Sequence, residues 1–116
     1  MYNATQALIE WLDGLGYDAY ATIPSARPER FITVQRTGGG ISNTIDHPTY
    51  AVQCWAQTYE QAENDALSIR NEIIDGNTRP ANFDAITINT SPYIWEDTAT
   101  KIPRYQFVID CVTHIK

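Results

Sequence analysis

The residues of this chain that could carry acid–base chemistry are few, and the first is the adjacent pair Asp46-His47. A general acid/base couple needs a nucleophile within hydrogen-bond reach. Neighbouring residues on a strand point to opposite sides, so Asp46 and His47 would not face one substrate together. Asp46 and Pro48 are better suited to shaping a turn into the next strand. We therefore expect no catalytic role for this pair.

A second acidic pair, Glu96-Asp97, follows Trp95 directly. Glycoside hydrolysis uses two carboxyl groups at a set separation across a cleft, and adjacency in sequence does not provide that separation. The flanking residues are those of a polar turn. The pattern predicts an exposed, solvated turn.

Metal and phosphate sites are also not indicated. No Walker loop, dinucleotide-binding fingerprint, nucleophile elbow or HExxH helix is present. The glycines at 38–40 are followed by Ile-Ser-Asn-Thr and not by a helix N-terminus, which a phosphate cradle would need. The possible metal ligands lack helical i, i+4 or CxxC spacing; they are Asp46, His47, Cys54, Cys111 and His114. We expect no catalytic centre, no metal and no cofactor.

Cys54 and Cys111 each lie within an apolar, strand-like stretch. In the reducing cytosol such cysteines are typically small buried hydrophobes. A disulfide would require neighbouring strands and suitable Cβ geometry. We expect two reduced, buried thiols.

Length and composition indicate one globular domain, residues 1–116. Hydrophobic residues make up 43% of the chain and charged residues 19%. The apolar runs are too short for a membrane helix, and residues 1–6 lack the features of a secretory signal. We expect a soluble protein made in the cytoplasm. The net charge of −6, with eight scattered basic residues, argues against a surface that follows nucleic-acid phosphates.

Hydrophobic periodicity predicts two helices and five strands. The first helix covers residues 3–13, with Asn3 as N-cap, and the second covers 58–75, with Thr58 as N-cap and Gly76 as its stop. Prolines predict a loop at residues 24–30. The glycines at 38–40 predict a strand break and a flexible loop to residue 48. The strands are expected at 18–22, 31–37, 49–57, 84–90 and 104–115.

The resulting order, α-β-β-β-α-β-β, predicts an α+β fold. We expect a single, mainly antiparallel sheet with both helices packed on one face. In the last strand Tyr105, Phe107, Ile109 and Cys111 share one side. The other side of the sheet is only half polar, because it carries Trp55, Val108 and Val112 among Gln and Asp residues. A partner subunit could cover that face.

Two segments carry a resemblance to a known family. The first is Ile23-Pro24-Ser25-Ala26-Arg27-Pro28-Glu29-Arg30-Phe31-Ile32-Thr33-Val34-Gln35-Arg36-Thr37-Gly38-Gly39-Gly40, a proline- and arginine-bearing loop that runs into a strand. The second is Asp46-His47-Pro48 through Val52-Gln53-Cys54-Trp55-Ala56, followed by a helix. Together with the N-terminal helix, these segments resemble the tail-completion (tail-terminator) proteins of long-tailed bacteriophages.

The resemblance implies a structural virion protein and not an enzyme. Proteins of this family assemble as rings, commonly hexamers, at the head-proximal end of the tail. There they end tube polymerisation and join the tail to the head connector. The implied partners are the chain itself, the major tail tube protein and a head-completion or connector protein, with DNA passing through without sequence-specific binding. The implied location is the virion, at the interface of head and tail.

Seven residues are candidates for subunit or partner contacts, and three of them are arginines expected to pair with carboxylates such as Asp46 on a neighbouring subunit. Trp55 is a candidate anchor for either core or interface. The full set is Arg27, Arg30, Phe31, Arg36, Asp46, Trp55 and Trp95.

Two other functions stay open at this point. One is a head-completion or neck protein on the connector. The other, from a different class, is a small cytosolic enzyme or ligand-binding module that uses the aromatic surface near Tyr93 and Trp95.

Overall fold

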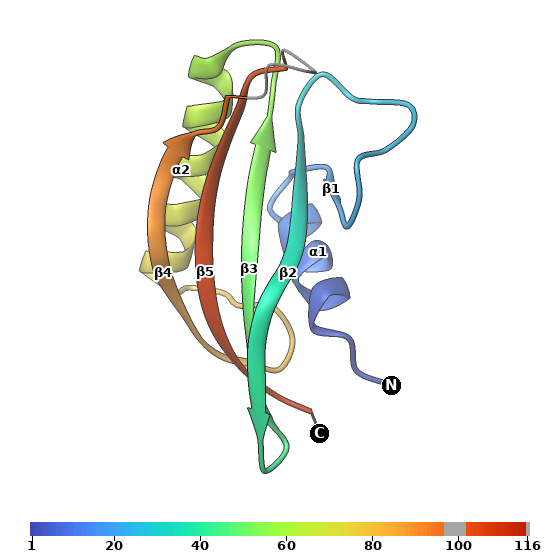
Figure 1. Cartoon of the computed structure of the whole chain (residues 1–116), viewed down its shortest axis with the longest axis vertical. Coiled ribbons are helices and arrows are strands. Elements are labelled where there is room, and N and C mark those ends of the chain that lie inside the picture. The colour runs from blue at the N-terminus through green and yellow to red at the C-terminus, as the bar shows by residue number, and fades with distance from the viewer. Residues whose placement is uncertain (97–101, 116) are drawn as a thin grey trace.

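A computed structural model gives the structure of the chain and describes residues 1–96 and 102–115. Helices and strands follow in the predicted order (Figure 1). They are α1 (Ala4–Gly14), β1 (Ala19–Tyr20), β2 (Phe31–Ser42), β3 (Ile45–Trp55), α2 (Tyr59–Asp75), β4 (Phe83–Ile94) and β5 (Arg104–His114). In the turn expected after Trp95, Asp97 and Thr98 lie outside the described residues.

Both helices begin where the sequence predicts, because a side-chain oxygen satisfies a backbone donor of the first turn. The Asn3 carboxamide accepts from the amide of Gln6 at 3.1 Å, and the Thr58 hydroxyl accepts from the amide of Gln61 at 3.2 Å. Helix α2 ends at Gly76, whose φ of 65° is the left-handed conformation of a helix C-cap.

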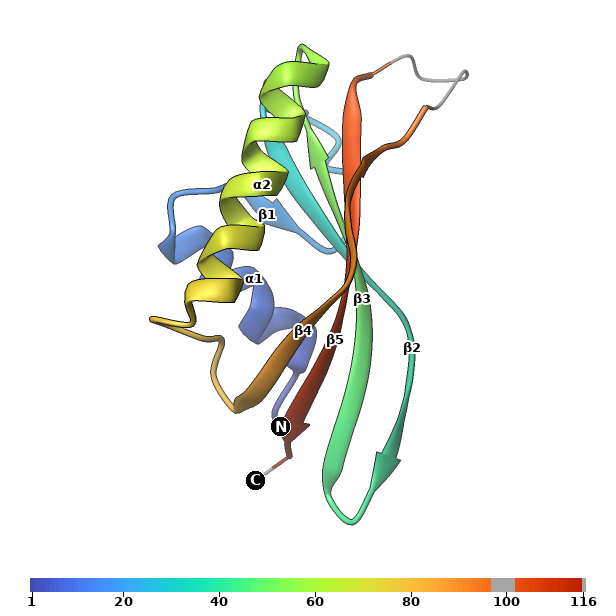
Figure 2. The ribbon, with the colours of Figure 1, turned by 90° about the vertical axis from the view of Figure 1, so that its left-hand side faces the viewer.

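The five strands form one sheet in the order β1-β2-β3-β5-β4. The short strand β1 pairs parallel with β2, and the other neighbours are antiparallel. Figure 2 shows α1 and α2 side by side on one face of this sheet, with the other face free of helices. The predicted α+β class is therefore confirmed.

The core lies between the sheet and its two helices. Tyr50, Val52 and Cys54 of β3 point into it, as do Phe107 and Ile109 of β5, and all five side chains are fully buried. The alternation predicted for the last strand, β5, is confirmed. The helices contribute Leu8, Leu12, Ala66 and Ile69. Burying one such large apolar side chain stabilises the fold by about 1.5–3 kcal/mol.

The strand break predicted at the three glycines is wrong. Strand β2 continues through them to Ser42, and the chain reverses at Asn43-Thr44 before β3 begins at Ile45. Asn43 and Thr44 have φ values of 50° and 67°, and positive φ at both central residues defines the tight type I′ hairpin turn. The weak strand propensity of glycine is overridden because each glycine pairs with a residue of β3.

Glycine is required at one of these three positions. Gly39 has φ +114°, and a Cβ built there would lie 2.0 Å from the His47 carbonyl oxygen. Its partner across the hairpin is Pro48, which lacks a donor, and within the described residues positions 47–48 of β3 are not paired with β5. A proline is tolerated inside β3 because no hydrogen bond to β5 is lost there.

Three further strand boundaries differ from the prediction. Strand β1 contains only Ala19 and Tyr20, whereas 18–22 was expected, although the Asp18 carbonyl still accepts from the Ile32 amide at 2.7 Å. Strand β3 starts at Ile45 and not at residue 49. Strand β4 extends beyond residue 90 to Ile94 despite Pro92, because an edge strand can spare a donor.

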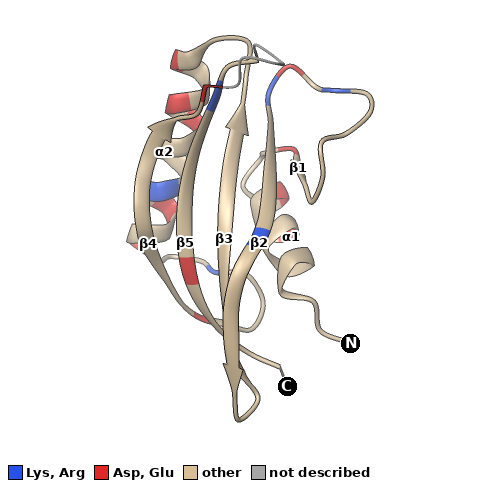
Figure 3. Cartoon of the chain, viewed as in Figure 1, with Lys and Arg blue, Asp and Glu red and all other residues tan. Residues whose placement is uncertain are grey.

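The charges are unevenly spread over the two layers. In Figure 3 the Asp and Glu colours gather on α2, and the strands carry few charges of either sign. Within the described residues, no helix is both long enough and apolar enough to cross a membrane.

The close approach at Gly39 gives a first prediction. Gly39→Ala should lower the free energy of unfolding by about 2–3 kcal/mol, because alanine disfavours this φ and its Cβ would collide with the His47 carbonyl. Gly40→Ala is the matched control: nothing lies within 4 Å of a Cβ at Gly40, so stability should change by less than about 1 kcal/mol. Urea unfolding of both variants measures the difference in the free energy of unfolding. Equal losses of stability in the two variants would contradict a specific requirement for glycine at position 39.

Candidate functional site

The seven candidate contact residues lie in three places. Arg27, Arg30 and Phe31 are at the end of the loop that leads into β2, and Arg36 and Asp46 lie across the β2–β3 hairpin. Trp55 and Trp95 lie on the helix-free face of the sheet. The residues do not converge on one cavity.

Arg30 connects the loop to the helix layer. Its guanidinium donates to both oxygens of Asp65 on α2, at 2.7 and 3.1 Å, and to the Gln61 carbonyl at 3.5 Å. The bidentate geometry is the strongest form of an arginine–carboxylate pair. About half of the Arg30 side chain is exposed, so the pair adds about 1 kcal/mol or less. Its main effect is to hold the start of β2 against α2.

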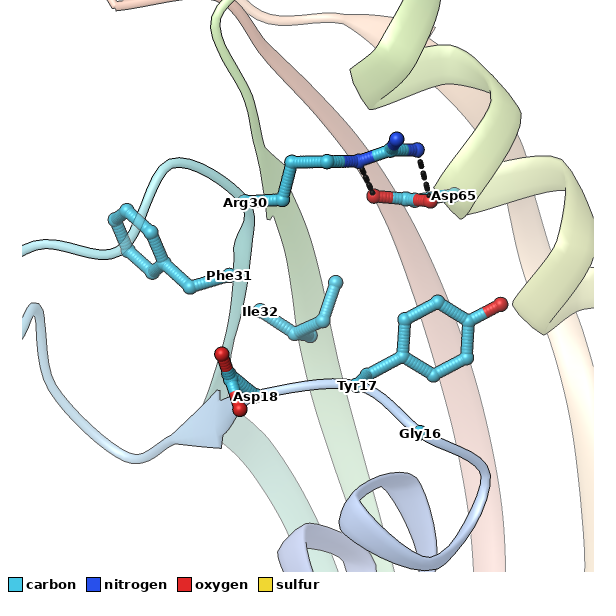
Figure 4. Close-up of a pocket in the computed structure, with 7 residues that line it drawn as sticks. All are labelled: Gly16, Tyr17, Asp18, Arg30, Phe31, Ile32 and Asp65. Carbon is cyan, nitrogen blue, oxygen red and sulfur yellow. Dashed lines mark hydrogen bonds and ion pairs between the residues drawn. The ribbon is translucent and has the colours of Figure 1, made fainter.

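This ion pair borders a pocket of about 410 Å³ between α2 and the segment that joins α1 to β1. Figure 4 shows Arg30 and Asp65 on one side of the pocket and Tyr17 facing them. The Tyr17 hydroxyl donates to the Ser68 hydroxyl at 2.8 Å, and burial raises the pKa of Tyr17. A tyrosine with a raised pKa stays neutral, and Asp65 is already paired with Arg30. The pocket therefore holds no poised nucleophile.

Arg27 lies away from this ion pair. It lines a second hollow of about 460 Å³ together with Phe31 and with residues that follow β3 and precede β5. The lining is Arg27, Pro28, Glu29, Phe31, Ala56, Gln57, Ile102 and Pro103.

Arg36 and Asp46 face each other across the hairpin. The guanidinium donates to both Asp46 oxygens at 2.7 and 2.8 Å. This pairing corrects the expectation that Arg36 would meet a carboxylate such as Asp46 on a neighbouring subunit, because the two residues pair within one chain. The hydrogen bonds from Arg36 hold the pKa of Asp46 below its ordinary value of 3.8. The ion pair stabilises the hairpin in its extended form.

Trp55 belongs to a row of rings that crosses the helix-free face, which we call the aromatic row. Trp55 stacks on Phe31, with the two ring centroids 5.5 Å apart. On the neighbouring strand β5, the Arg104 guanidinium lies 4.3 Å from the centroid of the Trp55 ring. Arg104 also lies 5.3 Å from the ring of Trp95. Trp55 is 1% exposed and Trp95 is 41% exposed. Of the two roles expected for Trp55, core residue and interface anchor, its burial supports the first. The complete row is Tyr20, Phe31, Trp55, Arg104, Trp95 and Tyr93.

A polar row runs beside the aromatic row on the same face. The Thr33 hydroxyl donates to Gln53, and the Gln53 amide donates to Gln106, each at 2.8 Å; Gln106 in turn donates to Tyr93. The Trp55 indole N–H donates to Thr33 at 3.0 Å and joins the two rows. Cross-strand pairs of this kind satisfy polar groups that a helix-free face would otherwise leave to water. The two rows therefore cover one part of the helix-free face, whereas Val108 and Val112 on the same face stay partly exposed.

Both cysteines are free and buried, as predicted. Burial raises the pKa of Cys111 to about 12 and also raises the pKa of Cys54. Neither thiol is a thiolate at neutral pH, so neither is a nucleophile or metal ligand there. Among residues 1–96 and 102–115, no three His, Cys, Asp or Glu side chains are grouped so as to hold a metal ion.

Sequence reasoning missed two partners that matter. Asp65 on α2 is not among the candidate residues, yet it binds Arg30. Arg104 was read only as the start of a strand, yet it lies between Trp55 and Trp95. Arg104 could have been identified only from its position opposite Trp55, and that position requires the register between β3 and β5. The spacing of residues along the sequence does not give this register.

Comparison with known proteins identifies no relative: no protein-family model and no curated protein sequence matches the chain. The function has to be argued from the residues and contacts of this chain.

The Arg36–Asp46 pair predicts a pH dependence. The folded-state pKa of Asp46 is lowered, so the pair stabilises the fold above the ordinary value of 3.8 and loses its effect as pH falls through the lower folded value. Asp46→Asn should cost about 1 kcal/mol or less at pH 7, because Arg36 is 40% exposed. The difference in the free energy of unfolding between this variant and the wild type should disappear below pH 3.8. A double-mutant cycle with Arg36→Gln isolates the pair, and a coupling that persists in acid would contradict this origin.

Trp55 gives a prediction on folding. Trp55→Asp should cost more than about 5 kcal/mol, because it removes a buried ring and places a carboxylate where no water reaches it. Circular dichroism should show a largely unfolded protein. Trp95→Asp is the control: its ring is 41% exposed, so the variant should stay folded. A folded Trp55→Asp protein with an unchanged urea midpoint would show that the aromatic row is dispensable.

Proposed function

We propose that this chain is a structural virion protein, a tail terminator that assembles as a ring on the head-proximal end of a phage tail. It ends tube polymerisation there and provides the surface that meets the head connector. Its partners are other copies of itself, the major tail tube protein and a connector protein. The protein is made in the host cytoplasm and resides at the head–tail interface.

One observation carries the proposal: the segments that resemble tail-completion proteins are adjacent in the fold and are exposed at both ends of β2. Residues 23–30 form the loop before β2, and residues 31–40 and 46–55 are the two strands of the hairpin. Residues 31–34 are buried, whereas residues 35–42 are all exposed. Figure 2 shows the tip of this hairpin extending past the helix layer. A projecting hairpin at one end of β2 and a tethered loop at the other suit contacts between subunits better than chemistry on a small molecule.

The ion pairs support the same function. Arg30 and Arg36 are each held by a carboxylate of the same chain, so they fix the loop and the hairpin in place. A preorganised surface loses less entropy when it docks than a mobile one does. This favours an assembly subunit, whose contact elements are held in shape before the partner arrives.

The charge of the chain fits a ring through which DNA passes. The net charge is −6, and the Asp and Glu residues gather on α2 (Figure 3). An acidic wall repels the phosphate backbone and does not retain it. DNA would therefore cross the ring without sequence-specific binding.

The proposal is tested by deleting the gene and imaging the resulting particles. We expect tails that fail to join heads and that vary in length, because nothing ends the tube. Supplying the protein in trans should restore joined particles of uniform length. Native mass measurement of the purified protein, alone and with isolated tails, should give a closed ring in at least one of the two samples.

A strict monomer that never binds tails, with tails of normal length in the deletion strain, would overturn the proposal. Joined particles in which the labelled protein cross-links to the connector but never to tube protein would replace it with the neck-protein function. Metabolic genes on both sides of this one would favour the ligand-binding module near Tyr93 and Trp95.

A further inference from the structure

The outer edge of β2 is open over most of its length. Strand β1 covers β2 only at Ile32 and Thr33, so residues 35–42 have a partner on one side alone, β3. The type I′ turn makes Ser42 and Ile45 a hydrogen-bonded pair, so the next pair, Ile41 and Asp46, is non-hydrogen-bonded. The backbone N–H and C=O of Ile41 therefore point outward. This edge can accept another strand.

The opposite edge of the sheet, formed by β4, is also open. In the described part of the chain β4 is the last strand of the sheet, with β5 as its single neighbour. Register shifts interrupt its pairing between Phe83 and Ala85 and again beyond Ile88. The regular stretch is residues 85–88, a four-residue edge without a charge or a proline.

The two open edges match in direction and in level. Strands β2, β3, β5 and β4 alternate in direction, so β4 runs antiparallel to β2. The strand pairings also place residues 38 and 87 on one line across the sheet: Gly38 pairs with Thr49, Thr49 with Asp110, and Asp110 with Thr87. If copies of the chain stand side by side, the β4 edge of one meets the β2 edge of the next as an antiparallel pair in register.

We propose that the β2 edge at residues 38–42 of one copy pairs with the β4 edge at residues 85–88 of the next copy, which joins the sheets of neighbouring subunits. This inference rests on the proposed ring function and identifies its subunit interface. The contact is head to tail, and such contacts close into rings when the rotation between copies allows it. Its expected register places Gly38 opposite Thr87 and Gly40 opposite Ala85.

The side chains along both edges permit this approach. The only charge in residues 35–42 is Arg36, which Asp46 of the same chain already neutralises. Gly38 and Gly40 present no side chain, and the space around an added Cβ is empty at both. Residues 35–42 contain no proline and no unpaired charge, and their one irregularity is the register shift between Arg36 and Gly38. The pairing with β3 is continuous over residues 38–42, which are therefore the part of this edge that can accept a strand.

Disulfide cross-linking between engineered cysteines tests the pairing. The four double variants combine Gly38→Cys or Gly40→Cys with Ala85→Cys or Thr87→Cys. Within one chain, β2 and β4 are separated by three strand spacings, about 14 Å, whereas a disulfide needs Cα atoms within about 7 Å. Any disulfide between the two positions must therefore join two copies. Cys54 and Cys111 are buried and do not interfere.

Oxidation of the free protein and of tails carrying each variant should give a ladder of linked multimers. We expect it from Gly38→Cys with Thr87→Cys and from Gly40→Cys with Ala85→Cys, with at least ten-fold less product from the control pair Gly38→Cys with Glu60→Cys. Glu60 is exposed on the first turn of α2, outside the sheet.

The outcomes separate the two claims. Rings seen on tails together with no cross-link from any of the four pairs would overturn the strand pairing and leave the proposed function standing. Equal cross-linking from the control pair would also overturn it. A protein that forms no oligomer, free or on tails, would overturn the ring function and the pairing with it.

Discussion

The stack of Phe31, Trp55 and Arg104 is the contact on which the rest of the fold depends. A sheet with helices on one side must bury the apolar side chains of its other side by different means. Here the side chains of neighbouring strands cover one another. Trp55 is 1% exposed on a face without helices, because a ring lies against it from β2 and a guanidinium from β5. Each contact stabilises by about 0.5–2 kcal/mol beyond burial. The stack also fixes where β2 and β5 begin, and so where the loops at their ends lie.

A self-covered sheet face limits where a partner can bind. The sequence suggested that a second subunit would cover the half-polar face, whereas the aromatic and polar rows already fill one part of it with contacts inside the chain. What stays open is the part of that face around Val108 and Val112 and the rim of the sheet, namely the distal part of β2, the outer side of β4 and the loop at residues 24–30. In the proposed pairing the interface lies at the edges, where affinity comes from backbone hydrogen bonds, and not on a face, where it comes from apolar burial.

The sequence predicted the helices and the layers better than it predicted the hairpin, for a physical reason. Helix caps and alternating apolar residues act locally, so Asn3, Thr58 and the buried side of β5 were identified correctly. The glycines at 38–40 are poor strand formers alone and become strand only through pairing with β3, a contact between residues distant in sequence. The partners of Arg30 and Trp55 depend likewise on how α2 and β5 pack, which no local pattern encodes.

The ordered hairpin leads to a different expectation for binding than a flexible loop would. As a flexible loop, residues 38–48 would have to become ordered on contact, and the entropy of that ordering would oppose binding. As a paired, ion-bridged hairpin with a tight turn, the same residues are ordered before any partner arrives. Gly39 is then not a source of flexibility. It is the one residue type that allows two backbones to pass so closely at Pro48.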